Sequence, residues 1–319
     1  MLSKNKKQAN VMNTTDVNLR EAKLELLVKS NWIAKFVNFE SYIEIPKVPS
    51  FSNGDKGFTV MLWFSYFKIK QHIQTHRGRI VHASVNSMPL LSYRKSKFKT
   101  GFELELVTYP FGMRLSFCTS VCFSGKLDLN PSTWYHVAVV GDDDERTVTF
   151  YIDGRKVNTE DYPRERSDWF IEPWKHAKML MGTNQDGHHF NGLISEVSVW
   201  KKALQEEQIK SNMHKHMGIS RDVEGLVAYW PLNEPPDEKV CYDFGPNNLD
   251  GTNHDLERTK QSHKSLFFPN VVWKFHPTSL LYLRLAIILF FLLLFMFCLR
   301  MIKHLSKDIV FNRRDDKEL

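Results

Sequence analysis

Two carboxylates in one short segment come nearest to catalytic spacing. Glu103 and Glu105 stand two positions apart in the run FELEL, so in a strand both side chains would point to one face. Two carboxylates on one face can act as general acid and nucleophile in glycoside hydrolysis. Here they alternate with Phe102, Leu104 and Leu106, which favours a solvated polar face. No Gly-rich phosphate loop, nucleophile elbow or metalloprotease helix accompanies them, so we expect a protein that is not an enzyme.

A second acidic group raises the question of metal binding. Asp142, Asp143 and Asp144 supply the hard oxygen ligands that suit Ca²⁺. They stand between two strand-like segments, however, where a solvated hairpin turn is the simpler explanation. Two histidine pairs, His188-His189 and His214-x-His216, lack the spacing that would arrange two imidazoles and a third ligand around one ion. We therefore expect no cofactor, with calcium as a disfavoured alternative.

Positive charge is concentrated in one part of the chain. The whole sequence has 43 Lys+Arg against 36 Asp+Glu, yet residues 56–102 hold nine Lys or Arg and no acid. The densest group, called the basic rim here, consists of Arg94, Lys95, Lys97 and Lys99. It interrupts the strand pattern as a loop would, and loops on rigid folds often carry binding residues. The basic rim predicts an anionic glycan, an acidic protein surface or anionic lipid headgroups as partner, although a merely solvated loop would also explain it.

A long apolar segment near the end predicts a transmembrane helix. Residues 280–299 read LLYLRLAIILFFLLLFMFCL, with Arg284 as the only charge. Their helical length of 1.5 Å per residue matches a hydrocarbon core of about 30 Å. A buried helix is the alternative, but such helices rarely lack a polar face as completely as residues 285–299 do. A membrane location also disfavours nucleic acid as a partner.

The orientation of this segment follows from two indications that disagree. Residues 300–319 are rich in Lys and Arg, which by the positive-inside rule places the tail in the cytosol or matrix and the large N-terminal part outside. Residues 1–30, however, contain no apolar run typical of a secretory signal peptide. The membrane and the topology stay open, with a slight preference for an outward-facing domain.

The middle of the chain has the periodicity of β-strands. Alternating apolar and polar residues mark strands over 102–106, 113–117 and 148–152, and turn residues such as Asp153-Gly154 separate them. One short helix is predicted near residues 201–213. This pattern predicts an all-β fold whose sheet edges must be covered by closure or by a second layer.

The cysteines give little information on redox state. They are Cys118, Cys122, Cys241 and Cys298. Four are too few for a disulfide scaffold, and because the last lies in the apolar segment, at most one bridge could form among the other three.

Several ordered blocks resemble laminin G-like and pentraxin-like domains of the concanavalin A-like superfamily. The blocks are WYHVAVV (134–140), VTFYIDG (148–154), GLISEVSVW (192–200) with the following Ala203-Leu204, and GLVAYWPL (225–232). The resemblance implies a two-sheet antiparallel jelly-roll sandwich in which motif aromatics belong to the core. The aromatics so assigned are Trp63, Trp134, Phe150 and Trp200. The sequence departs from the family at Ser195, where an Asp is usual.

The resemblance implies a binding role more than an enzymatic one. Hydrolases on this architecture carry E-x-D-x-(x)-E in one strand, which is missing here, and residues 83–101 lack the acid that calcium-binding laminin G-like domains use. We expect a membrane-anchored, non-enzymatic module that binds a glycan or protein through its loops. The alternative is a structural or accessory subunit that docks onto neighbouring membrane proteins; a glycoside hydrolase ranks third. The expected division is a polar leader (1–35), a sandwich (36–255), a juxtamembrane linker (256–278), a transmembrane helix (279–299) and a basic tail (300–319).

Overall fold

The computed structural model describes most of the chain between residues 19 and 260. The described ranges are 19–46, 57–68, 73–76, 79–83, 86–94, 101–109, 112–117, 122–161, 178–215 and 222–260. The chain divides into two compact units, 1–269 and 270–319, and all described residues belong to the first.

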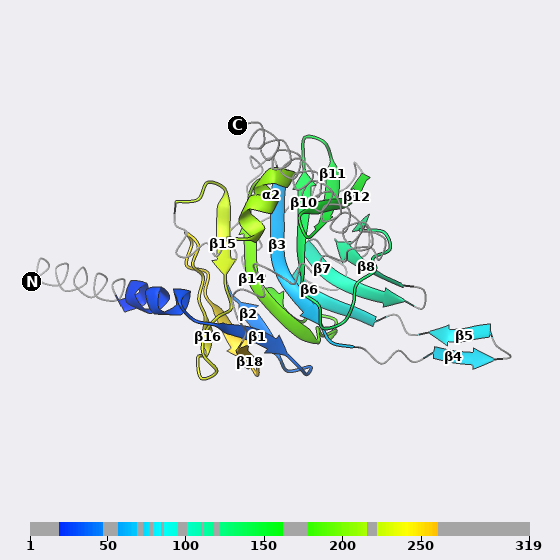
Figure 1. The fold of residues 1–319 in the computed structure, drawn as a ribbon, viewed down its shortest axis with the longest axis horizontal. Helices are drawn as coiled ribbons and strands as arrows, with labels where there is room; N and C mark the ends of the chain where they lie inside the picture. The colour runs from blue at the N-terminus through cyan, green and yellow to red at the C-terminus, as the bar shows by residue number, and fades with distance from the viewer. Residues whose placement is uncertain are drawn as a thin grey trace, which may run out of the picture. The chain divides into compact units, whose positions relative to one another are not determined.

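The described strands form two large antiparallel sheets (Figure 1). Sheet A has the order β12 (Arg155–Asp161), β11 (Thr147–Ile152), β10 (Tyr135–Asp142), β3 (Gly57–Tyr66), β14 (Gly192–Trp200), β1 (Trp32–Phe36) and β18 (Glu257–Lys260), and β15 (Leu226–Trp230) also pairs with β14. Sheet B has the order β16 (Val240–Cys241), β17 (Gly251–His254), β2 (Tyr42–Ile45), β13 (Met179–Met181), β6 (Asn86–Arg94), β7 (Gly101–Tyr109), β8 (Gly112–Phe117) and β9 (Cys122–Phe123). β4 (Ile73–His76) and β5 (Arg79–Ala83) form a separate hairpin.

The core lies between sheets A and B. One hydrophobic cluster combines inward side chains of both sheets, and Phe58 of β3 stacks on Phe117 of β8 with ring centroids 5.4 Å apart. The alternation predicted for residues 102–106, 113–117 and 148–152 places their apolar side chains in this core. The prediction of an all-β, two-layered sandwich is therefore confirmed.

The other face of sheet A is covered near its centre by α2 (Glu206–Met213) and the segment before it. Thr59 of β3 donates a hydrogen bond to the carbonyl of Lys202 (2.7 Å) and accepts one from the Leu204 amide (3.0 Å). Together with the core on the opposite face of the sheet, this cover leaves all ten residues of β3 buried. The predicted helix near residues 201–213 is confirmed, although it begins only at Glu206.

The aromatics assigned to the core are buried, as predicted. Trp63, Trp134, Phe150 and Trp200 are each at most 8% exposed. Ser195, where the family usually has Asp, is also buried and donates a hydrogen bond to the Pro231 carbonyl (3.1 Å). Pairing between β14 and β3 shifts register directly after it.

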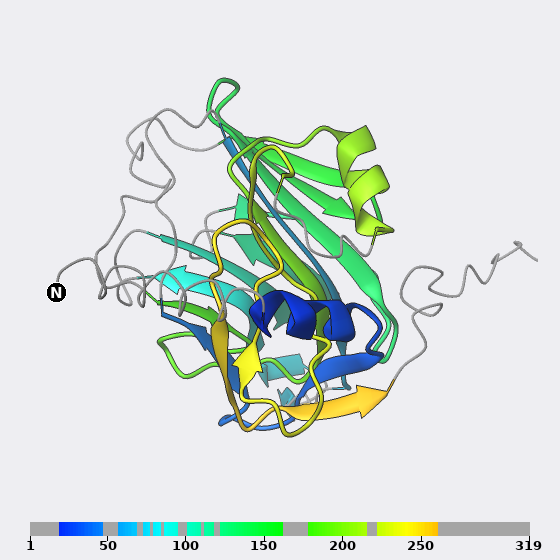
Figure 2. The same cartoon turned by 90° about the vertical axis from the view of Figure 1, so that its left-hand side faces the viewer.

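The expectation of one helix and a polar leader needs correction. Residues 19–28 are helical, and Leu24 and Leu27 are buried in a cluster with Tyr229 and Phe244. Figure 2 shows this helix, in dark blue, beside the yellow segments of the C-terminal part of the sandwich. The leucines lie three positions apart on one helix face, which lets them pack although charged residues surround them. β1 begins at Trp32 and β18 extends to Lys260, so the folded region also exceeds the expected range 36–255.

Several predicted features lie outside the described residues: the transmembrane helix at 279–299, the basic tail at 300–319, Cys118 and Cys298. Among the described residues, no helix combines the length and apolarity needed to cross a membrane. Cys122 and Cys241 are free thiols buried in the sandwich.

Candidate functional site

The basic rim is only partly described. Arg94 is the last residue of β6, where its backbone pairs with Gly101 of β7. Lys95, Lys97 and Lys99 lie outside the described residues. An anionic partner for this segment therefore stays a prediction.

The acidic group at residues 142–144 forms part of a hairpin. Asp142 ends β10, and its side chain accepts a hydrogen bond from the Glu145 amide (3.0 Å) inside the turn that leads to β11. Arg146 has a φ of 55°, which allows the turn to close. Within the described parts of the chain, no group of three or more His, Cys, Asp or Glu side chains could hold a metal ion. Calcium binding stays an untested and disfavoured alternative.

The interpretation of Glu103 and Glu105 as solvated acids is wrong. Their side chains are 2% and 6% exposed. β7 lies inside sheet B between β6 and β8, and neighbouring polar groups satisfy its carboxylates. Ser92 donates a hydrogen bond to one oxygen of Glu103 (3.0 Å) and the Asn184 amide to the other (2.7 Å); Ser87 donates one to Glu105. Both acids thus serve as buried hydrogen-bond acceptors of the fold.

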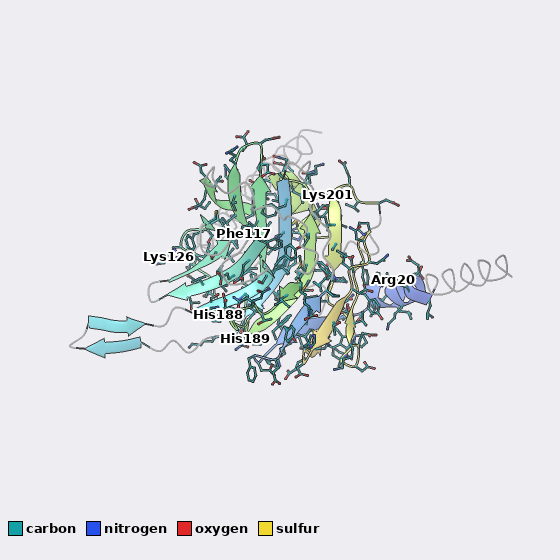
Figure 3. All side chains as sticks on the ribbon, turned by 180° about the vertical axis from the view of Figure 1, so that it is seen from behind. Arg20, Phe117, Lys126, His188, His189 and Lys201 are labelled. Carbon is teal, nitrogen blue, oxygen red and sulfur yellow. The ribbon has the colours of Figure 1, made fainter. Side chains whose placement is uncertain are left out.

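Asn184 also fixes the loop between β13 and β14. Its side-chain oxygen accepts hydrogen bonds from the amides of Asp186 and His188, both 3.0 Å long, while its amide group holds Glu103. Gly187, with a φ of 79°, allows this tight turn. The loop carries His188 and His189 near the start of β14. Lys201 follows the last residue of this strand, so it lies at the other end of β14 (Figure 3).

His189 connects this loop to a groove on the surface of the sandwich. Its ring contacts the ring of Phe39, with centroids 6.1 Å apart. Burial, followed by the neighbouring charge of His188, lowers the pKa of His189. Phe39 is 67% exposed, an unusual state for a large aromatic side chain in the loop between β1 and β2.

The groove beside Phe39 has a volume of about 470 Å³. It is lined by Phe39, Glu40, Tyr42, Lys239, Asn253, His254 and Asp255. Tyr42 of β2 and His254 of β17 are register partners in sheet B, and their rings stack with centroids 4.2 Å apart and an interplanar angle of 8°. The volume falls within the range of about 300–1,000 Å³ typical of small-molecule sites. An aromatic wall flanked by polar side chains suits a ligand with both apolar and hydroxyl-bearing faces.

Hydrogen bonds between loops hold the groove in shape. The Ser41 hydroxyl lies 2.8 Å from the Asp255 carbonyl and 2.9 Å from the Asn38 side chain, so it links the β1–β2 and β17–β18 loops. Asn253 donates a hydrogen bond to the Glu238 carbonyl (3.0 Å) and accepts one from the Leu256 amide (3.1 Å). The aromatic wall therefore stands on a fixed backbone.

Sequence reasoning missed this groove. The pairing of β2 with β17 joins segments from opposite ends of the domain, and no local pattern indicates that Tyr42 and His254 meet. The only sequence signal is the position of Phe39 before Tyr42 in an otherwise polar loop, where an unpaired aromatic residue suggests a surface contact.

A comparison with protein-family profiles agrees with the two-sheet fold described above. The profile described as the concanavalin A-like lectin/glucanases superfamily, of the laminin G type, matches residues 38–210, more than half of the chain. The chain belongs to this superfamily. No curated protein matches the chain significantly in sequence.

Solved structures share the architecture of the superfamily at low sequence identity. A candidate carbohydrate-binding protein from Bacteroides ovatus has a TM-score of 0.50 and 18% identity, with 73% of this chain and 61% of that protein covered. The match thus spans less than two thirds of the bacterial protein. The heptameric SAP-like pentraxin of Limulus polyphemus gives 0.48 and 13% identity over 75% of this chain and 99% of its own. At these identities the resemblance to the Bacteroides protein concerns the fold.

Proposed function

We propose that this protein is a membrane-anchored, non-enzymatic recognition module that binds a carbohydrate in the groove lined by Phe39, Tyr42 and His254. The observation that carries the proposal is the stacked Tyr42–His254 pair beside the highly exposed Phe39. The apolar face of a sugar ring can pack on such aromatic surfaces while its hydroxyls bond to the polar side chains around them. The superfamily name and the Bacteroides relative support carbohydrate as the ligand class.

The burial of Glu103 and Glu105, the pair with catalytic spacing in the sequence, supports the non-enzymatic part. Glu103 and Glu105 are buried, and both oxygens of Glu103 accept hydrogen bonds from within the fold. General acid catalysis needs a carboxyl within hydrogen-bond reach of the substrate oxygen. Catalysis by this pair would require the fold to open.

Replacing Phe39 by Ala should weaken carbohydrate binding about twofold to twelvefold, because an aromatic contact contributes roughly 0.5–1.5 kcal/mol. Tyr42→Ala should have a similar or larger effect. A glycan microarray identifies a ligand, and titration calorimetry then compares the variants. Val157→Ala, on the edge strand β12, is a matched control that removes an exposed apolar side chain elsewhere. Unchanged affinity in both groove variants would contradict the proposed site.

The proposed anchor is the apolar segment at residues 279–299. Removing residues 279–319 should move the protein from the membrane fraction to the soluble fraction and preserve β-type circular dichroism, because every described strand of both sheets lies at or before Lys260. Fractionation of the two forms measures this. A full-length chain found entirely in the soluble fraction would contradict the anchor and leave the carbohydrate site unaffected.

A further inference from the structure

We infer that the groove selects uncharged sugar rings and rejects sialylated, carboxylated or sulfated ones. This inference rests on the proposed carbohydrate site and names its ligand class. It depends on the charged side chains that line the groove and on their pairing.

Glu40 and Asp255 are the two carboxylates of the lining. Both residues are exposed. Within the described parts of the chain, neither side chain takes part in a hydrogen bond or ion pair, although nearby carboxylates do: Glu44 pairs with Lys178 (2.7 Å) and Glu257 with Lys35 (2.7 Å). The acceptor oxygens of Glu40 and Asp255 are therefore available to a ligand.

Hydrogen bonds and a tight turn fix the backbone positions of Glu40 and Asp255. The Glu40 amide donates a hydrogen bond to the Asn38 side chain (2.9 Å), and the Asp255 carbonyl lies 2.8 Å from the Ser41 hydroxyl. Asp255 has a φ of 43°, which turns the chain sharply between β17 and β18. The two acids thus belong to loops that are tied together beside the aromatic wall.

The lining combines these two acceptors with one ammonium donor, Lys239, and its formal charge is negative when His254 is neutral. A sugar hydroxyl both donates and accepts hydrogen bonds, so a neutral ring can use both carboxylates and the ammonium group. A ligand carboxylate or sulfate only accepts, so a groove carboxylate that faces this group meets an anion in place of a hydroxyl donor. An anion held about 4 Å from an unpaired carboxylate in water also loses roughly fivefold in affinity.

Arg94, the described residue of the basic rim, belongs to another part of sheet B. The groove strands β2 and β17 are neighbours near one edge, and β13 separates β2 from β6, the strand that ends at Arg94. An anionic partner of the basic rim and a neutral sugar in the groove are therefore separate predictions.

The test compares neutral glycans with sialylated or sulfated derivatives of the same core, using the full-length protein in nanodiscs of uncharged lipid. We expect the wild type to bind the neutral glycan at least tenfold more tightly than its anionic derivative, with binding sensitive to Tyr42→Ala. The double variant Glu40→Gln/Asp255→Asn should reduce this preference severalfold. The control Glu145→Gln/Asp222→Asn removes the same two charges from exposed positions outside the groove and should keep the preference.

Each outcome bears on a different statement. Binding that depends on Tyr42 but shows no preference for neutral glycans, or a preference that survives Glu40→Gln/Asp255→Asn, overturns the selectivity and leaves the proposed function intact. If the protein binds no glycan, or if Tyr42→Ala and Phe39→Ala leave the affinity unchanged, the groove is not a carbohydrate site. This outcome overturns both the proposed function and the inference.

Discussion

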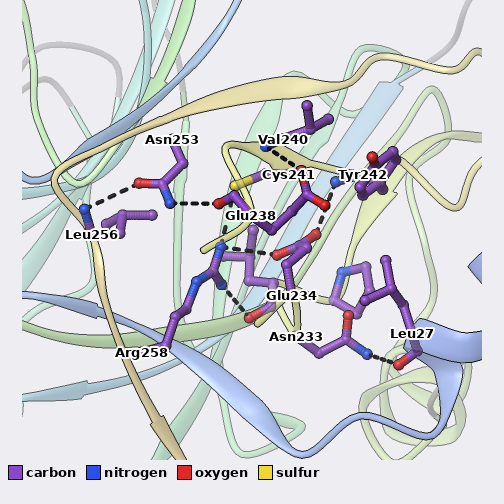
Figure 4. A network of polar contacts seen from close by, with 12 residues as sticks. Leu27, Asn233, Glu234, Glu238, Val240, Cys241, Tyr242, Asn253, Leu256 and Arg258 are labelled. Carbon is purple, nitrogen blue, oxygen red and sulfur yellow. Dashed lines mark hydrogen bonds and ion pairs between the residues drawn. The ribbon is translucent and has the colours of Figure 1, made fainter. Parts of the chain in front are cut away.

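Replacing Arg258 by Met should lower the free energy of unfolding by about 3–5 kcal/mol, because it leaves a buried carboxylate without its partner. Arg258 and Glu234 form an ion pair of 3.0 Å, and both side chains are 0% exposed. Arg258 also donates to the Leu232 carbonyl (2.8 Å). Figure 4 shows Arg258 beside Glu234, which accepts a hydrogen bond from the Tyr242 amide (2.8 Å). Burial raises the pKa of the Glu234 carboxyl, and the positive charge of Arg258 opposes that rise.

The double variant Arg258→Met/Glu234→Leu separates the cost of the unpaired charge from the value of the pair. Buried ion pairs are often no more stabilising than apolar residues of similar size, so the double variant should recover much of the lost stability. Urea denaturation followed by tryptophan fluorescence measures all three forms. A double variant less stable than Arg258→Met alone would show that the pair itself stabilises the fold.

Lowering the pH from 6.5 toward 3 should remove on the order of 4 kcal/mol of stability through His136 alone. Burial, and next the neighbouring charge of His214, lowers the pKa of His136 from 6.5 to about 3. Its imidazole is 1% exposed, packs edge-on against Trp63 (5.3 Å between centroids) and has no partner for Nδ1 among the described residues. The unfolded chain takes up a proton below pH 6.5 and the folded protein does not until about pH 3, so protonation favours unfolding across this interval.

His136→Gln isolates this contribution from that of the carboxylates, which also titrate in acid. The stability difference between wild type and variant should shrink or reverse as the pH falls from 7 to 4, because only the wild type carries the buried imidazole. The histidine resonances of the folded wild type give an independent readout. An imidazole signal of His136 that titrates near pH 6 would contradict the prediction.

The sequence patterns predict the local structure well. Alternation identified β7, β8 and β11, the Asp153-Gly154 pair identified the turn between β11 and β12, and both residues of that pair have positive φ. The family blocks predicted the sandwich and its buried tryptophans. These features depend on neighbours in sequence, where periodicity and turn chemistry act directly.

The polar contacts could not be predicted in the same way, because their partners come from distant segments. Alternation correctly placed Glu103 on the face opposite Leu104, but nothing near it shows that Asn184 would cover its carboxylate. Arg258 directly follows Glu257 in the sequence, and no local pattern indicates that it pairs with Glu234 instead. The groove is missed for the same reason, since its wall joins β2 to β17.

The pairing of β1 with β18 has a consequence for biosynthesis. Trp32, at the start of the first described strand, lies opposite Lys260, at the end of the last described one. On the ribosome, β1 emerges early, and neither of its neighbours β14 and β18 is available until most or all of the domain has been synthesised. Contacts between such distant segments form slowly, and an unpaired strand edge is prone to aggregation. We therefore expect the exposed edges of β1 to need protection until both β14 and β18 have been synthesised.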